Sequence, residues 1–338
     1  MAASISCIKH AKSCVKPSLF FTVQRQTSPA GACARRAAEI RSVRAAASAT
    51  ADVQHNERFC LELVRSRDYE GFVCSLLLPE AARRSALALR AFNVELAQAG
   101  EGLCFSEVSR SDANAVLEDG HRRHLQRQTT QPASQRRAVE DFVSQAVKKH
   151  NLTKRWLTRI IAEREKDLDD RGYRNLQELE SYAENAQSPL LYLLLESLGV
   201  KDVHADHAAS HVGKAHGIVT CLRATPHHSG RRRVYLPLDI CMLHGVSQED
   251  FIRRSREQDV RDVVYDIASQ AHVHLQNARS FGPRVPAAAM PAFLHTVVLE
   301  DFLQRVRKAD FDIFHPSLQK RNPLLAIQLY LRSWKKTY

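Results

Sequence analysis

Apolar side chains recur at helical spacing along most of this chain, and this pattern limits the possible folds more than any other feature. The two clearest stripes are Val260, Val263, Val264, Ile267, Ala271 and Leu275, and Leu324, Ile327, Leu331 and Trp334. Strand-like alternation bounded by turns is rare, and turn formers are scarce, with 12 Gly and 12 Pro among 338 residues. The sequence therefore predicts an all-α fold.

The N-terminal 50 residues differ in composition from the rest. Residues 1–51 are rich in Ala and Ser and contain eight Lys and Arg but only one acid, Glu39. They hold +7 of the formal net charge of +12, which leaves +5 for the remaining chain. We predict a disordered mitochondrial transit peptide over residues 1–50, removed near residues 44–52, and no nucleic-acid partner. A basic tail that binds acidic surfaces is the alternative, and a chloroplast address shares the composition.

The remaining chain, from residue 55, has no apolar run long enough to cross a membrane. Its longest strongly apolar run extends from Leu190 to Leu195, whereas a spanning helix needs about 20 apolar residues. The eight cysteines include no C-x-x-C pair, which favours reduced, buried thiols over disulfides or a zinc cluster. His204, His207, His211 and His216 could share a helix face, but we favour ordinary hydrogen bonding over a zinc site.

Two segments carry a family likeness. Residues 76–98 read LLLPEAARRSALALRAFNVELAQ, and residues 211–240 read HVGKAHGIVTCLRATPHHSGRRRVYLPLDI. They resemble the Leu-Pro helix and the signature helix of the squalene/phytoene synthase family. The likeness covers about residues 57–98 and 139–338. It implies a single domain over residues 55–338 with the isoprenoid-synthase fold, a helical bundle around a central cavity.

The resemblance also shows where the chemistry of the family is missing. Family members hold magnesium on two D-x-x-x-D boxes, because an i, i+4 spacing puts both carboxylates on one helix face. Counted from the flanking motifs, the box positions are Ala97, Glu101, Ala224 and His228. The metal-proximal amide positions of the family are Gly217 and Thr220, and Pro226 should distort the helix or place His227 and His228 in a loop. The retained binding candidates are Arg223, Arg233 and Tyr235.

These losses predict no catalytic residue, no bound metal and no cofactor, and thus a pseudoenzyme. Strings such as RAFNVELAQ, YAENAQSPLLYL and GIVTCLRATP resemble animal members of the family that assist in assembling respiratory complex I. The resemblance implies a non-catalytic assembly factor whose partners are complex I subunits or assembly intermediates. It also implies a peripheral location at the matrix side of the inner membrane. The alternative is a divergent prenyl-diphosphate-binding transferase or a lipid-binding protein.

Three further predictions concern smaller features. Residues 99–136 are polar and lack an apolar stripe, so we expect a disordered insert or a replaced segment within the domain. Asp262 and Asp266 have the i, i+4 spacing of a box but lie opposite the stripe that begins at Val260, which favours solvation. Trp334 with Lys335 and Lys336 resembles an interfacial anchor, although a docked terminal helix is the favoured interpretation.

Overall fold

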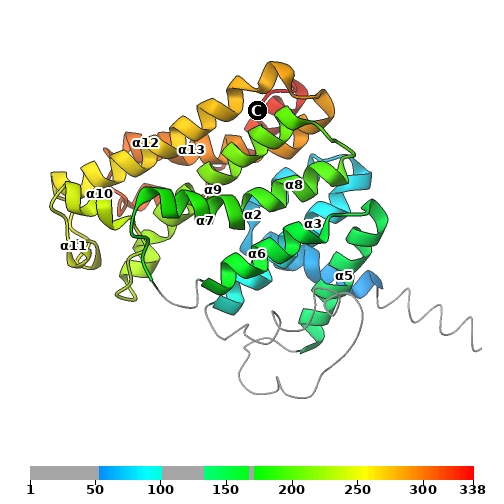
Figure 1. Cartoon of the computed structure of the whole chain (residues 1–338), viewed down its shortest axis with the longest axis horizontal. Helices are drawn as coiled ribbons and strands as arrows, with labels where there is room; N and C mark the ends of the chain where they lie inside the picture. The colour runs from blue at the N-terminus through cyan, green and yellow to red at the C-terminus, as the bar shows by residue number, and fades with distance from the viewer. Residues whose placement is uncertain (1–52, 101–132, 167–170) are drawn as a thin grey trace, which may run out of the picture. The chain divides into compact units, whose positions relative to one another are not determined.

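A computed structural model describes residues 53–100, 133–166 and 171–338 of the chain. All regular structure in these ranges is helical, which confirms the predicted all-α fold (Figure 1). A first helix covers residues 53–67. The others are α2 (Tyr69–Leu76), α3 (Glu80–Gly100), α5 (Ala133–His150), α6 (Lys154–Lys166), α7 (Leu176–Ala186), α8 (Ser188–Ser197), α9 (Val203–Ser229), α10 (Leu238–Leu243), α11 (Gln248–Ile252), α12 (Gln258–Ser280), α13 (His295–Lys308) and α14 (Leu325–Trp334), with short 3-10 turns η2 (Gly282–Arg284), η3 (Ala287–Phe293) and η4 (Pro316–Gln319).

The helix α9 is the centre of the larger core. The Asp202 side chain caps its start by accepting a hydrogen bond from the Ala205 N–H, and α7, α8, α12 and α13 all pack against it. The buried side of α9 alternates small and branched side chains, such as Ala215 and Ile218. The predicted stripe on α12 is buried against it from Val260 to Leu275, as expected. This packing fixes α9 in the interior, where its polar residues must find partners.

A second core joins α3, α5, α6 and the helix over residues 53–67. Phe142 and Val143 of α5 and Ile160 of α6 are buried there, beside Leu89 of α3. Leu193 of α8 belongs to the same cluster, while Leu194 and Leu195 belong to the α9 core. The helix α8 therefore contributes side chains to both cores and connects them.

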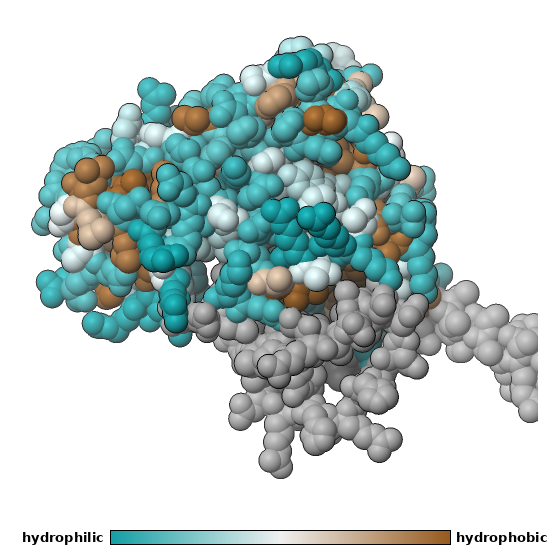
Figure 2. Space-filling view, viewed as in Figure 1, coloured by the Kyte–Doolittle hydropathy of each residue, from teal (hydrophilic) through white to brown (hydrophobic). Residues whose placement is uncertain are grey.

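The last helix is docked, as predicted, but not through its apolar stripe. The helix α14 packs on α13 and α2 through Leu325 and Leu329, whereas the stripe of Leu324, Ile327, Leu331 and Trp334 is exposed. Apolar residues occupy both sides of this helix, so spacing alone could not show which side faces the core. Figure 2 shows a mostly hydrophilic face with separate hydrophobic patches, one of them at the end formed by α10 and α11.

The expected break at Pro226 is also wrong. The helix α9 continues through Pro226 to Ser229, so His227 and His228 are helical. Proline removes one backbone N–H and crowds the carbonyl group four residues earlier, but α9 still extends three residues beyond Pro226.

Two predicted segments fall wholly or largely outside the described residues. These are the leader over residues 1–50 and most of residues 99–136, of which α3 reaches Gly100 and α5 starts at Ala133. None of the described helices is long and apolar enough to span a bilayer.

Candidate functional site

A cavity of about 390 Å³ lies between the two cores. One face of α3 and one face of α9 form much of its wall, since the lining residues of each helix recur every three or four positions. The α7–α8 junction, α6, α13 and the helix over residues 53–67 complete it. The lining residues are Arg67, Asp68, Ala86, Leu89, Arg90, Asn93, Val94, Ala97, Gln98, Arg164, Gln187, Leu190, Leu191, Leu194, Val212, His216, Thr220, Arg223 and His295.

Two glycines on α9 determine how closely this helix packs against α7 and α8. A Cβ on Gly217 would lie 2.2 Å from the Ala183 Cβ on α7, and a Cβ on Gly213 would lie 2.6 Å from the Ser188 Cα on α8. Only glycine permits such close helix contact. Gly217 therefore faces α7, while Val212 and His216, on a neighbouring face of α9, line the cavity.

The charged part of the lining is strongly basic. Among the described residues, Arg67, Arg90, Arg164 and Arg223 line the cavity, against one carboxylate, Asp68. Arg90 donates to the Asp68 Oδ2 over 2.7 Å. Burial disfavours the charged form of Arg90, but Asp68 outweighs that effect and raises the pKa of the guanidinium. The cavity therefore favours an anion over a cation.

Two of the other arginines, Arg223 and Arg164, are held by hydrogen-bond partners. Arg223 donates to Glu70 over 2.6 Å and lies above the ring of Phe302. Arg164 donates to the Tyr182 hydroxyl over 2.6 Å. These contacts fix two guanidinium groups while each keeps further N–H donors, because guanidinium has five.

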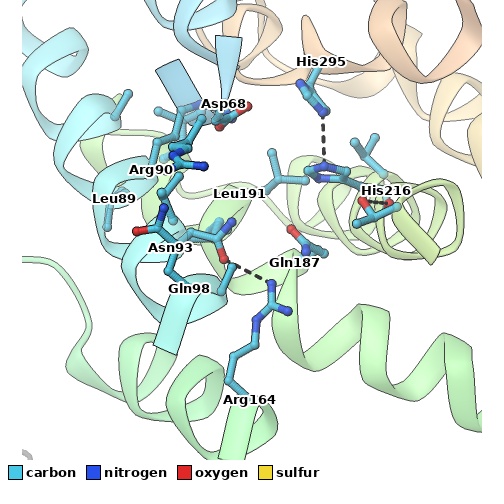
Figure 3. Close-up of a pocket in the computed structure, with 18 of the residues that line it drawn as sticks. Asp68, Leu89, Arg90, Asn93, Gln98, Arg164, Gln187, Leu191, His216 and His295 are labelled. Atoms are coloured by element: carbon cyan, nitrogen blue, oxygen red, sulfur yellow. Dashed lines mark hydrogen bonds and ion pairs between the residues drawn. The ribbon is translucent and has the colours of Figure 1, made fainter. Parts of the chain in front are cut away.

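Two histidines meet at the inner end of the cavity. The Nε2 atoms of His216 on α9 and His295 on α13 are 3.2 Å apart (Figure 3). Burial lowers the pKa of His216 to about 3, with Arg90 adding to the effect, and burial also lowers the pKa of His295 well below its ordinary value. Both imidazoles are therefore neutral at pH 7, one donating to the other.

Buried polar atoms without a hydrogen-bond partner among the described residues also occur at the cavity. They include the Gln187 Oε1 and the His295 Nδ1, and both residues are 4% exposed. Apolar side chains also line the cavity, among them Leu89 of α3, Leu191 of α8 and Val212 of α9. The cavity thus has a cationic, polar part and a hydrocarbon part, as a ligand with a charged head and an apolar body would need.

Of the residues that the sequence singled out, some line the cavity and others do not. Ala97, Thr220 and Arg223 line the cavity. Ala224, His228, Arg233 and Tyr235 do not, and the His228 ring instead packs edge-on against Tyr235, with ring centroids 4.7 Å apart. Glu101 lies outside the described residues.

The acidic and histidine patterns do not form a metal site in the described ranges. There, no group of three or more His, Cys, Asp or Glu side chains could hold an ion. His204, His207 and His211 do share a face of α9, where their rings stack along Phe281. Asp262 accepts from Gln258 and Asp266 is paired with His244 over 2.7 Å, both on the outer side of α12.

Sequence reasoning missed several residues of the site and its supports. Arg90, Gln187 and His295 were not singled out, although polar residues in apolar helical stretches are a usable signal. It also missed a polar cluster behind the cavity. There the Glu184 carboxylate accepts hydrogen bonds from Ser188, Tyr192 and Ser210 over 3.0, 2.9 and 2.6 Å.

The chain is similar to known proteins of one family in both sequence and fold. The family model of squalene/phytoene synthase matches residues 64–328. The fold is similar to a dehydrosqualene synthase in complex with ligand, with a TM-score of 0.69 and 15% identity over 85% of this chain and 99% of the other. It is also similar to squalene synthase HpnC from Alicyclobacillus acidocaldarius, with a TM-score of 0.62 and 18% identity over 77% and 96% of the two chains.

Other proteins are much more similar to this chain in sequence than these two structures are. A Homo sapiens protein named NADH dehydrogenase (ubiquinone) complex I, assembly factor 6 is 60% identical over 285 residues, 83% of each chain. Its Bos taurus counterpart is 59% identical over 289 residues, again 83% of each chain. A Dictyostelium discoideum homolog is 35% identical over 83% of this chain and 78% of its own.

Proposed function

The chain belongs to the squalene/phytoene synthase family, and from this premise we propose that it is a non-catalytic assembly factor for respiratory complex I. The observation that carries the proposal is the donor set of the cavity. Its one carboxylate among the described residues, Asp68, is hydrogen-bonded to Arg90, and four arginines line the same cavity. Relatives about 60% identical bear the name of complex I assembly factors, which supports the same role here.

This donor set does not fit the magnesium ions on which the family's synthases depend. Magnesium prefers oxygen ligands, mainly carboxylates, with substrate phosphates. The cavity has Ala97 at one box position, and Ala224 and His228 at two others lie outside its lining. Four guanidinium groups would repel a divalent cation further. These residues therefore support no metal-assisted ionisation or condensation step, and we infer a pseudoenzyme.

The assembly role is tested in cells from which the protein has been removed. Native gels should show less assembled complex I, with the other respiratory complexes affected less. Re-expression of the wild-type chain should restore the complex I band. Normal complex I in cells that fully lack the protein would contradict the proposal.

The pseudoenzyme part has a separate test. Purified protein incubated with farnesyl or geranylgeranyl diphosphate and magnesium should yield no condensation product above a heat-inactivated sample. Turnover would overturn this part of the proposal and would favour a divergent transferase.

We further propose that the protein is imported into mitochondria and acts at the matrix side of the inner membrane. The basic, acid-poor leader supports import, and complex I assembly requires access to the organelle. N-terminal sequencing of the protein recovered from mitochondria should find a start near residues 44–52. When mitoplasts are treated with protease, the protein should remain intact, as expected for a protein on the matrix side.

A second candidate function is metal-free binding of an anionic amphiphile in the cavity. The observation that favours it is the set of buried polar atoms without partners among the described residues, in a cavity also lined by four arginines and apolar side chains. Inorganic diphosphate in the presence of EDTA is the simplest probe of the charged part. The variant Arg67→Gln/Arg223→Gln should bind it about tenfold more weakly, because two charge-assisted contacts are lost. Arg65→Gln on the exposed surface is the control, and equal binding by all three proteins would reject the site.

A further inference from the structure

The outward face of α14 is the largest group of exposed apolar side chains on a single described helix. Leu324, Ile327, Tyr330, Leu331 and Trp334 are 56%, 59%, 63%, 45% and 74% exposed. On the opposite side, Leu325 and Leu329 fix the helix to α13 and α2. The position of α14 is therefore set by its inner face, and the outer apolar face is not needed to dock it.

The charged side chains of the segment that carries this face all have one sign. Residues 320–338 contain no Asp or Glu and five basic side chains, namely Lys320, Arg321, Arg332, Lys335 and Lys336. Arg321 lies over the ring of Tyr69, and Arg332 is 3.7 Å from Glu300, so part of the positive charge is engaged. Lys335 and Lys336 are exposed and make no ion pair with another described residue. They follow Trp334 directly, at the end of the apolar face.

This combination matches the surface of a membrane with anionic lipids. A helix that lies in the interface places apolar and aromatic residues among the acyl chains and headgroups and its basic residues against lipid phosphates. Trp and Tyr favour that depth because their rings are apolar at one end and polar at the other. With ten residues, α14 is far too short to span a bilayer. Its outer face is moreover the convex surface of one helix, which suits a flat lipid surface.

We propose that α14 is a membrane-binding helix that lies on an anionic phospholipid surface through Leu324, Ile327, Leu331 and Trp334. This helix would provide the contact for the peripheral membrane location given under the proposed function. The choice of membrane rests on that proposed function, whereas the test of lipid binding does not depend on complex I. A second exposed pair, Met242 and Leu243 of α10, offers a contrast. It is as exposed as Trp334, but α10 and the next helix, α11, carry acidic residues and no Lys or Arg of their own.

The position of Trp334 can be measured directly in the full chain. The protein has two tryptophans, so Trp156→Phe leaves Trp334 as its single tryptophan. On addition of phosphatidylcholine–phosphatidylglycerol vesicles, its emission should shift to shorter wavelength and be quenched by brominated acyl chains. Binding driven by the basic leader alone would leave Trp334 in water. An unchanged spectrum with vesicle-bound protein therefore overturns the proposal, as would an equal response to pure phosphatidylcholine vesicles.

Matched variants test the face itself. Ile327→Ser/Leu331→Ser should weaken binding to the anionic vesicles by about tenfold, because two apolar side chains no longer enter the interface. Met242→Ser/Leu243→Ser removes an exposed apolar pair of the same size from the other end and should change binding little. Circular dichroism should be unchanged in both, since all four side chains are exposed.

The outcomes separate this inference from the assembly role. If Ile327→Ser/Leu331→Ser binds anionic vesicles as well as Met242→Ser/Leu243→Ser does, the proposed lipid-binding face is wrong. The native-gel result for complex I would not be affected by that outcome. If Ile327→Ser/Leu331→Ser fails to restore complex I yet binds vesicles normally, the face contacts a protein and the lipid assignment is wrong.

Discussion

Asp68 links two structural roles through its two carboxylate oxygens. Its Oδ1 accepts the Gly71 N–H over 3.0 Å and caps the start of α2, while its Oδ2 accepts the Arg90 Nη1 over 2.7 Å. Both side chains are mostly buried, at 25% and 19% exposure. The carboxylate that could have bound a cation in the cavity is thus used to hold α3 against the start of α2.

Asp68→Ala should therefore destabilise the protein strongly. It leaves the buried guanidinium of Arg90 without its counter-charge and removes a helix cap, at a combined cost of about 3–5 kcal/mol. Chemical denaturation would measure this loss. Glu62→Gln removes the partner of Arg65 in an exposed ion pair and should change the free energy of unfolding by less than about 1 kcal/mol. Equal effects of the two variants would contradict the role of Asp68.

The neutral pair of His216 and His295 should make the fold sensitive to mild acid. Their pKa values in the folded protein, about 3 for His216 and well below the ordinary value for His295, lie under the unfolded value of 6.5. Below pH 6.5 the unfolded chain binds protons that the folded chain does not. Their contribution is thus complete above pH 6.5 and is lost as the pH falls toward about 3.

The free energy of unfolding should fall by about 2–3 kcal/mol from the two residues between pH 7.5 and pH 5.5, since one pKa unit corresponds to about 1.4 kcal/mol. Denaturant titrations at both pH values would show it. The variant His216→Asn/His295→Asn should lose most of this dependence, and His211 and His274, with pKa values also lowered by burial, would retain a smaller part. An unchanged pH dependence in the variant would show that the pair is not its source.

Gly217 should tolerate no larger residue. A Cβ there would come within 2.2 Å of the Ala183 Cβ, so Gly217→Val must move α9 away from α7, at a cost of about 3 kcal/mol or more. Ala81→Val, on the exposed side of α3, introduces the same branched side chain with only its small propensity cost. Thermal melting of the two variants would compare them, and equal midpoints would show that α9 and α7 are not in close contact.

Helical periodicity was enough to predict the fold class and the buried side of α12, because residues such as Val263 and Ile267 allow only one apolar face. It failed on α14, where Leu325 and Ile327 lie on opposite sides of the helix and only tertiary packing selects Leu325. It failed at Pro226 because a proline either ends a helix or is accommodated within it, and the local sequence did not show which of the two occurs here.

The site was predicted only where a motif marked it. Arg223 and Ala97 were found through their spacing from the family's motifs, and both line the cavity. His295 is 79 residues from its partner His216, and no local pattern connects them. The same holds for Arg90 and Asp68, whose pairing requires knowing how α3 crosses the start of α2. Long-range polar pairs of this kind need the fold before they can be recognised.

Glu184 should be the most sensitive residue of the polar cluster behind the cavity. Its carboxylate accepts hydrogen bonds from Ser188 and Tyr192 of α8 and from Ser210 of α9, so one side chain of α7 joins three helices. Glu184→Leu would leave three partly buried hydroxyl groups without this acceptor and should cost about 3 kcal/mol. Glu184→Gln keeps one acceptor oxygen, and its amide can donate to a hydroxyl, so it should cost about 1 kcal/mol. Urea denaturation of the two variants would give the difference, and a Leu variant as stable as the Gln variant would show that the hydroxyls find water or other partners instead.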